Sequence, residues 1–232
     1  MKILAKDTIT IKNSKTKILY FRIKPNNLKM TIRDIIVTLT NTSWISKFDD
    51  GYIKTSLKAR AERTALLVKR KLKDGRTSKK FKSIDNMGEY VVSELSRRTI
   101  VSQLNYLDIP LGEIIKESAL RNPGFDFFSE NNDQVLIFGE AKFSKKANKY
   151  GSALEQINRF EKEKKDKVEI INIRDFVSEE SLNNLDNNLK GFAAAFSAKE
   201  ISDQKIIKNI KKNKHFKELL KFEEIILVAV NL

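Results

Sequence analysis

The first forty residues show the hydrophobic pattern of β-strands. Residues 8–23 and 30–40 are rich in β-branched and aromatic side chains, which fit the pleated surface of a sheet. Polar turn residues interrupt these runs at Asn13–Ser14 and again at Pro25–Asn27. The pattern therefore predicts a group of strands at the N-terminus.

From residue 54 the apolar positions change to helical spacing. One stripe over 54–72 is followed by Asp74–Gly75, a stop signal for a helix. A second stripe predicts a helix over 83–104, and a shorter helical piece is expected over 111–120. The first stripe consists of Leu57, Ala61, Ala65, Val68 and Leu72, and the second of Met87, Val91 and Leu95.

Two apolar runs of strand length follow, at 125–128 and 134–143. The five residues between them, 129–133, are all polar, as in a loop that closes a β-hairpin. A hairpin is the firmest structural expectation from this sequence.

The pattern after the hairpin predicts both helices and strands. Ser152 and Glu155 have the spacing of a capping box that opens a helix. Residues 168–173 are apolar enough for a further strand. One or two Asn- and Lys-rich helices are then expected before a last apolar run at 225–230.

Charge points to a polyanionic partner. The chain has 45 Lys and Arg against 30 Asp and Glu, a formal net charge of +15. Twelve basic residues against two acidic ones lie between 54 and 82, a local net charge of +10. Such a stretch favours nucleic-acid binding, but a solvated helix face followed by a basic linker accounts for it equally well.

Composition also excludes several classes of site. The chain has no cysteine, so disulfides, zinc knuckles, iron–sulfur clusters and cysteine nucleophiles are ruled out. Its one histidine, His215, excludes a His-rich metal site and is not expected to be catalytic. A catalytic metal would need oxygen ligands, which favours Mg²⁺ or Mn²⁺.

The sequence is that of a protein without a membrane segment. The N-terminal residues lack the continuous apolar stretch of a signal peptide. No window approaches the roughly 20 apolar residues needed to cross a bilayer. A cytoplasmic location is expected.

The second strand of the predicted hairpin carries candidate chemistry. Glu140 and Lys142 are two residues apart, so their side chains leave the same face of the sheet. Asp126 lies on the paired strand, and strands about 4.8 Å apart would bring its carboxylate near Glu140. Cleavage of a phosphodiester requires a divalent ion held by carboxylates and a cation that offsets phosphate charge. Asp126 and Glu140 would supply the carboxylates, and Lys142 would supply the cation.

A Glu-x-Lys triplet is a weak signal, because Glu163–Lys165 repeats it in a charged helical stretch. Glu140 and Lys142 differ in that they interrupt an apolar strand, where polar groups cost free energy unless they are paired or bind a metal. The alternative is a Glu–Lys pair on the solvated face of an edge strand.

Pro123–Asp126, a gap of thirteen residues and Glu140–Lys142 resemble the PD-(D/E)xK nuclease signature. The proline is displaced from the aspartate by two residues, and the resemblance covers about 84–173. It implies an α/β fold with a restriction-endonuclease-like core, a central mixed sheet flanked by helices. A strand-rich accessory region with a basic helix would occupy 1–82, and the nuclease domain with a helical C-terminal extension would occupy 83–232.

Three shorter motifs are similar to the nuclease subunit of the Hachiman anti-phage defence system and its relatives. They are Gly88–Glu89, Gly124–Asp126 and Phe138–Phe143. The resemblance implies a metal-dependent DNase that acts with a separate superfamily-2 helicase. The chain itself has no Gly-x-x-x-x-Gly-Lys-Ser/Thr phosphate-binding loop, so a motor would be another polypeptide.

The resemblance also implies roles for individual residues. Asp126 and Glu140, with the main-chain carbonyl of Ala141, would hold Mg²⁺ or Mn²⁺. Lys142 would orient the attacking water and offset phosphate charge. Glu89 would be a further catalytic group, either as a secondary ligand of the metal or as a group that contacts the ligands. The alternative is that Glu89 is an ordinary glutamate on the surface of its helix.

Other residues are candidates for supporting roles. Glu94 is a substitute for Glu89, because it is nearer the apolar face of the same helix. Lys145, Lys146 and Lys149 would contact the DNA backbone, and Gln156 would form a hydrogen bond near the substrate phosphate. A competing hypothesis is a non-catalytic nucleic-acid-binding or adaptor subunit that keeps a nuclease-like fold and uses its basic stretch for binding.

Overall fold

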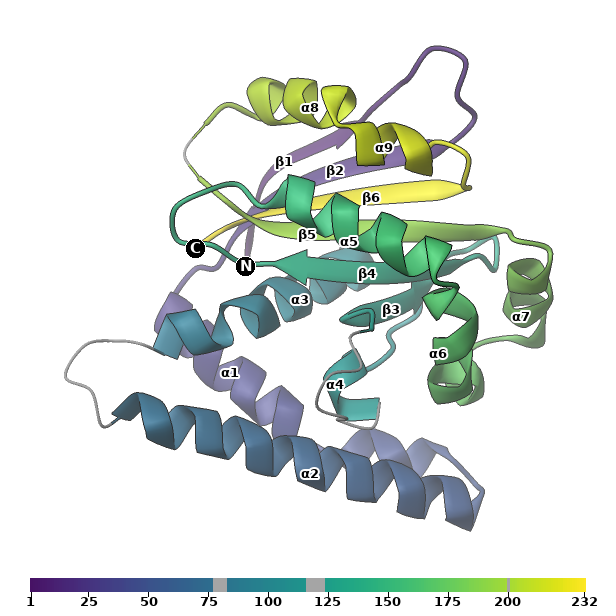
Figure 1. Cartoon of the computed structure of the whole chain (residues 1–232). Coiled ribbons are helices and arrows are strands. Elements are labelled where there is room, and N and C mark those ends of the chain that lie inside the picture. The colour runs from purple at the N-terminus through teal and green to yellow at the C-terminus, as the bar shows by residue number, and fades with distance from the viewer. Residues whose placement is uncertain (77–82, 116–123, 200) are drawn as a thin grey trace.

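A six-stranded mixed sheet is the centre of the computed structural model, which describes residues 1–76, 83–115, 124–199 and 201–232 (Figure 1). The strands lie in the order β1-β2-β6-β5-β4-β3. They are β1 (Lys2–Thr8), β2 (Lys17–Lys24), β3 (Phe127–Glu130), β4 (Leu136–Lys142), β5 (Lys190–Ala198) and β6 (Glu224–Asn231). The predicted α/β class, with a mixed sheet flanked by helices, is confirmed.

Parallel strands make up the middle of the sheet. β2, β6, β5 and β4 run parallel to one another, while β1 and β3 are antiparallel to their neighbours. Strands that are covered on both faces read as continuous apolar runs rather than alternating ones. β5 is buried along its whole length and β6 is buried except at its last residue.

Helices cover both faces of this sheet (Figure 1). The side chains of α5, α8 and α9 pack into the hydrophobic cluster on one face, and those of α1 and α3 into the cluster on the other. α2 packs on α1, α3 and α4. The helices are α1 (Leu28–Thr40), α2 (Gly51–Arg76), α3 (Ser83–Leu104), α4 (Gly112–Ile115), α5 (Tyr150–Lys162), α6 (Lys165–Ile173), α7 (Glu179–Asp186), α8 (Asp203–Lys212) and α9 (Lys214–Leu219), with 3₁₀ turns η1 (Ser43–Lys47) and η2 (Arg174–Phe176).

Several sequence-based predictions are confirmed. α2 includes the helix expected over 54–72, α3 matches the one expected over 83–104, and β3 and β4 form the predicted antiparallel hairpin. The helix expected over 111–120 is present as α4, and its remainder lies outside the described residues.

The N-terminal prediction is only partly right. The run over 8–23 contains β2 and the end of β1, but 30–40 is the helix α1 rather than a strand. The side chain of Asn27 caps this helix by accepting a hydrogen bond of 3.1 Å from the Met30 amide. Ile35 is buried against the sheet, so tertiary packing overrides the β-propensity of the run.

The strand predicted at 168–173 is wrong, because these residues belong to α6. Val168 and Ile171 are exposed, with 57% and 71% of their surface open to solvent. Glu169 is buried instead and accepts a hydrogen bond of 3.1 Å from the amide of Phe125. The apolar residues Val168 and Ile171 therefore do not contribute to the core.

The capping box predicted at the start of α5 is also wrong. The helix begins at Tyr150, and Lys149 is its N-cap without a side-chain hydrogen bond. Ser152 therefore lies inside the first turn. The helix itself is present as expected, with Ile157 and Phe160 buried.

β5 was not predicted at all, although it lies between β4 and β6. Its small residues allow close packing: a Cβ added at Gly191 would come 2.9 Å from the main-chain oxygen of Glu224. The last apolar run, 225–230, lies within β6, and α7, α8 and α9 occupy the C-terminal third. This third therefore contributes two strands of the sheet as well as helices.

Strands from both predicted regions belong to one sheet. β2, from the region 1–82, pairs in parallel with β6, from the region 83–232. β5 and β6 also lie beyond the segment 84–173 that was expected to hold the core. Within the described ranges, no helix is both long and apolar enough to cross a membrane.

Candidate active site

The β3–β4 hairpin brings Asp126 to the strand that carries Glu140. Asp126 comes immediately before β3, and its amide donates a hydrogen bond of 2.8 Å to the carbonyl of Gly139. Its carboxylate oxygen Oδ2 accepts one of 2.7 Å from the amide of Ala141. Asp126 is therefore held by the backbone on both sides of Glu140.

Glycine allows the close approach of the two strands here. Phe127 pairs with Gly139 across the hairpin. A Cβ added at Gly139 would lie 2.2 Å from the Phe127 ring, which is completely buried. The register that aligns Asp126 with Glu140 thus depends on the absence of a side chain at residue 139.

Glu140 is a completely buried carboxylate with one oxygen unsatisfied. Its Oε1 lies 2.6 Å from Nζ of Lys142. Its Oε2 is buried and has no hydrogen-bond partner within the described part of the chain. A buried polar atom without a partner costs free energy, so this oxygen is available to accept a hydrogen bond or to bind a cation. Oδ1 of Asp166, whose other oxygen pairs with Lys190, is in the same situation.

Nearby charges act on both members of this pair. Burial and the charge of Asp126 raise the pKa of Glu140 well above its usual range, although Lys142 acts in the opposite direction. Burial alone would lower the pKa of Lys142, but Glu140, Asp126 and Glu89 together outweigh it and raise that pKa. The carboxylates of Asp126 and Glu140 are therefore close enough to repel each other.

Glu89 lies at the rim of this cluster. Its carboxylate is 60% exposed, and its Oε1 is 3.9 Å from Nζ of Lys142. α3 approaches the end of β4 closely because residue 88 is glycine: a Cβ added at Gly88 would lie 2.2 Å from the Phe143 ring. The structure thus brings together Asp126, Glu140, Lys142 and Glu89, with Glu89 in solvent.

Glu94, the suggested substitute for Glu89, does not belong to the cluster. It is completely buried and accepts two hydrogen bonds of 2.8 Å from Arg97 and one of 2.6 Å from Arg98. Its charge is satisfied within α3, and this alternative is wrong.

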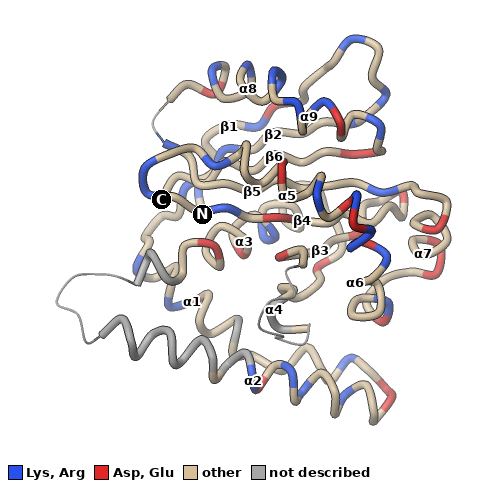
Figure 2. The backbone as a smooth tube through the Cα atoms, viewed as in Figure 1, with Lys and Arg blue, Asp and Glu red and all other residues tan. Residues whose placement is uncertain are grey.

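The lysines that were predicted to contact nucleic acid lie in the loop between β4 and α5. Lys145 and Lys146 are exposed in the loop between β4 and α5, where Figure 2 shows basic residues, and Lys149 is half-buried at its end. Hydrogen bonds tie the loop down, since the Ser144 amide donates to Oγ of Ser197 at 2.8 Å. The loop presents its lysines from an anchored backbone.

An open groove leads from Lys142 along α5. It has a volume of about 610 Å³, and Gln156, Arg159, Lys162 and His215 are among its lining residues. Gln156 therefore shares a groove with the site lysine. Arg159 and Lys162 were not among the predicted contacts. Their spacing indicates a shared side of the helix, because Arg159 is three residues from both Gln156 and Lys162.

Most side chains of the basic stretch over 54–82 lie outside the described part of the structure. The structure describes the side chains of 54–63 and 66 only. Among these, Arg60 has a structural contact, because its Nη1 donates to the carbonyl of Ile115 at 2.9 Å. Pro123 of the motif also lies outside the described residues.

The donor set suits a hard cation with few protein ligands. Across the described residues, no group of three or more His, Asp or Glu side chains is arranged to hold a metal ion. Asp126, Glu140 and the Ala141 carbonyl offer two carboxylates and one carbonyl. Mg²⁺ is commonly bound by one or two carboxylates while it keeps several waters, and the unsatisfied oxygen of Glu140 fits such a role.

Comparison of the chain with protein-family models, curated proteins and solved structures finds no match. The fold is defined as a mixed α/β sheet with a buried carboxylate–lysine cluster at the end of β4. Assignment of a function therefore depends on the chemistry of this cluster and on the motifs in the sequence.

Proposed function

We propose that this protein is a divalent-metal-dependent nuclease that hydrolyses phosphodiester bonds in DNA. Asp126, Glu140 and Lys142 form its active site, with Glu89 at the rim. The observation that carries the proposal is the convergence of Asp126, Glu140 and Lys142 beside an open groove. Within this cluster, one oxygen of the completely buried Glu140 has no partner among the described residues.

The chemistry of these side chains suits phosphodiester hydrolysis. A Mg²⁺ or Mn²⁺ ion held by Asp126, Glu140 and the Ala141 carbonyl would supply a Lewis acid and a bound water of lowered pKa. The ammonium group of Lys142 offsets charge on the phosphate and orients the attacking water. The hydrogen bond from the Ala141 amide keeps the Asp126 carboxylate in position for this task.

The position of the cluster in the fold supports the same proposal. β4 and β5 are parallel, and Lys142 is the last residue of β4. In open α/β sheets ligands bind outside the carboxyl ends of the strands. A substrate in the groove along α5 would meet the active site at this end of the sheet.

Cleavage assays test the proposal directly. Wild-type protein would be incubated with linear, circular and single-stranded DNA and with RNA, with and without Mg²⁺ or Mn²⁺. We expect cleavage of DNA that depends on the metal. If DNA stays intact under every divalent-metal condition, also with a helicase partner present, the proposal fails.

Lysines of the β4–α5 loop are expected to bind the DNA backbone. Changing both Lys145 and Lys146 to Ala removes two cations next to the site, so affinity should fall for all sequences and the salt dependence of binding should weaken by about two units of slope. Binding would be measured at several salt concentrations. The control is the double change of Lys208 and Lys212, two exposed lysines of α8; an equal effect there would contradict a local contact.

The second candidate is a non-catalytic nucleic-acid-binding or adaptor subunit. It is favoured by the ion pair between Lys142 and Glu140, which alone satisfies half of the carboxylate, and by the lack of a three-acid group within the described residues. A subunit of this kind would bind DNA without cutting it. Glu140→Ala would then leave its biological activity unchanged.

A role in anti-phage defence and a superfamily-2 helicase partner are part of the proposal. They are supported by the short motifs around Glu89, Asp126 and Glu140 that resemble Hachiman nuclease subunits. Co-expression with such a helicase, followed by purification of a complex and infection assays, tests them separately from the cleavage chemistry.

A further inference from the structure

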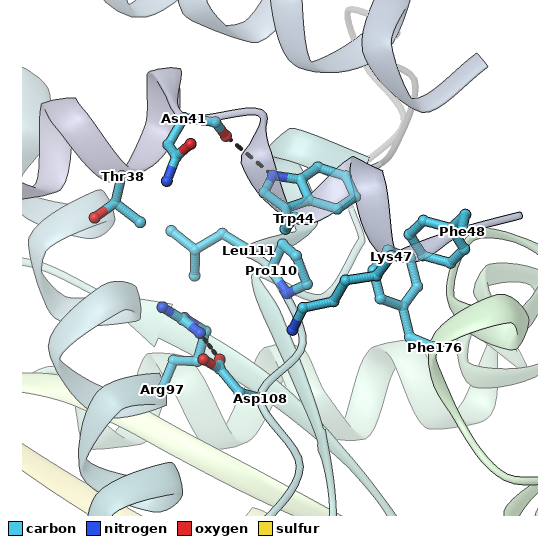
Figure 3. Close-up of a pocket in the computed structure, with 10 residues that line it drawn as sticks. All are labelled: Thr38, Asn41, Trp44, Lys47, Phe48, Arg97, Asp108, Pro110, Leu111 and Phe176. Carbon is cyan, nitrogen blue, oxygen red and sulfur yellow. Dashed lines mark hydrogen bonds and ion pairs between the residues drawn. The ribbon is translucent and has the colours of Figure 1, made fainter. Parts of the chain in front are cut away.

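A small pocket lies apart from the active site, between α1, η1, the segment before α4 and η2 (Figure 3). Its volume is about 190 Å³. The lining residues that matter to its chemistry are Trp44, Lys47, Phe48, Asp108, Leu111 and Phe176. None of them belongs to the carboxylate–lysine cluster.

Aromatic rings form one wall of this pocket. Trp44 and Phe48 both pack on Phe176, with ring centroids 5.7 Å and 5.0 Å apart. The indole nitrogen of Trp44 donates a hydrogen bond of 3.0 Å to the carbonyl of Asn41, which fixes the ring. With its polar atom already satisfied, Trp44 offers the pocket an apolar surface.

Three charged side chains line the same pocket: Lys47, Arg97 and Asp108. Oδ1 of Asp108 accepts a hydrogen bond from Arg97, and Arg97 also donates to Glu94. This network fixes the orientation of the Asp108 carboxylate. The Asp108 side chain is 60% exposed and can still accept hydrogen bonds. Lys47 is exposed and has no ion pair with any residue that the structure describes.

The size of the pocket limits what it can hold. A cavity of about 150 Å³ is enough for benzene, whereas pockets for drug-sized ligands have about 300–1,000 Å³. The pocket therefore suits one planar ring system, with the rest of the ligand outside. Bases bind proteins by stacking on aromatic side chains, and a carboxylate accepts hydrogen bonds from an exocyclic amino group such as that of cytosine.

We propose that this pocket binds a nucleobase that carries an exocyclic amino group, as part of a nucleotide. The base lies against the Trp44 wall, Asp108 accepts a hydrogen bond from the amino group, and Lys47 faces the phosphate. The ligand is either a free mononucleotide or an unstacked nucleotide of a single strand. This binding is independent of the proposed nuclease activity.

Trp44 makes the test specific, because it is the only tryptophan of the chain. Its fluorescence would be followed while CMP, AMP, GMP, UMP or a short single-stranded oligo(dC) is added, with calorimetry as a second readout. We expect saturable changes and at least about fivefold tighter binding of CMP than of UMP. Tight binding of the oligonucleotide alone would assign the site to a strand, and binding of CMP alone to a free nucleotide.

Two variants separate the contacts. Asp108→Asn should remove the preference for CMP over UMP, since an amide also donates. Lys47→Ala should weaken CMP but not cytidine, and Lys29→Ala, at an exposed lysine of α1, is the control. The proposal is overturned if no nucleotide changes the Trp44 signal up to about 1 mM, the weak end of specific binding. It is also overturned if neither variant alters the binding.

Discussion

Glu140→Gln is expected to lower the rate of metal-dependent DNA cleavage by roughly 10²–10³-fold, the loss typical of removing one group that stabilises a transition state. Gln has the same shape as Glu, but its amide is neutral and a poor ligand for Mg²⁺. The cleavage rate of a linear DNA substrate would be measured for both proteins at saturating Mg²⁺.

The same substitution should leave the melting temperature unchanged or raise it. Glu140 is completely buried, and both burial and Asp126 raise its pKa, so its charged form is less favourable in the folded protein than in the unfolded chain. Gln removes that charge and can still accept from Lys142. A protein that loses activity but not stability distinguishes a functional carboxylate from a structural one.

The matched control is Glu180→Gln. Glu180 is exposed in the first turn of α7 and does not line the groove along α5, whereas Glu163 of the second Glu-x-Lys triplet does. The Glu180 variant should keep full activity. Full activity of Glu140→Gln, or an equal loss in Glu180→Gln, would contradict the proposed active site.

Glu94→Gln is expected to destabilise the protein by about 3 kcal/mol, because Arg97 and Arg98 lose the buried carboxylate that they share. Their other ion-pair partners, Asp108 and Asp34, are exposed. Glu94 is completely buried and accepts hydrogen bonds from both Arg97 and Arg98. For a chain of this size the melting temperature should fall by roughly 6–12 °C. Thermal and urea denaturation would measure the change.

Asp34→Asn provides the comparison for this network. Asp34 pairs with Arg98 at the surface, where its side chain is 58% exposed, and exposed ion pairs contribute at most about 1 kcal/mol. Its effect should therefore be small. If Glu94→Gln proves as stable as Asp34→Asn, the buried network does not hold α3 as described.

Glu140→Gln and Glu94→Gln are the same chemical change at two completely buried glutamates. The expected results differ because Glu94 has its charge matched by two arginines, whereas one oxygen of Glu140 has no partner within the described structure. Burial and an unpartnered oxygen do not by themselves identify a functional carboxylate, because Asp166 has both and pairs with Lys190. What sets Glu140 apart is its place beside Asp126 and next to the groove that Lys142 lines.

Local patterns predicted the parts of the fold that depend on neighbouring residues. The hairpin around Asp126 and Glu140 follows from two apolar runs and a polar loop, and α3 follows from the four-residue spacing that begins at Met87. Both patterns involve residues that are close together in the sequence. The convergence of Asp126, Glu140 and Lys142 is a consequence of that hairpin.

Long-range packing explains the predictions that were wrong. Ile35 is buried against the sheet, and Ile32 and Ile36 are partly buried beside it, so the helix is stabilised by one face of α1. Val168 and Ile171 are exposed on α6, although their sequence is that of a strand. β5 escaped prediction because its alanines carry no periodicity, and its neighbours β4 and β6 come from distant parts of the chain.

The sequence by itself determined the chemistry that is open to this protein. Without cysteine and with one histidine, any metal site must use oxygen ligands, and a hairpin of this length places Asp126 beside Glu140. Only the tertiary structure decided that Glu140 is completely buried and that one of its oxygens has no partner among the described residues. That property depends on side chains brought together from separate strands and helices, which no local pattern contains.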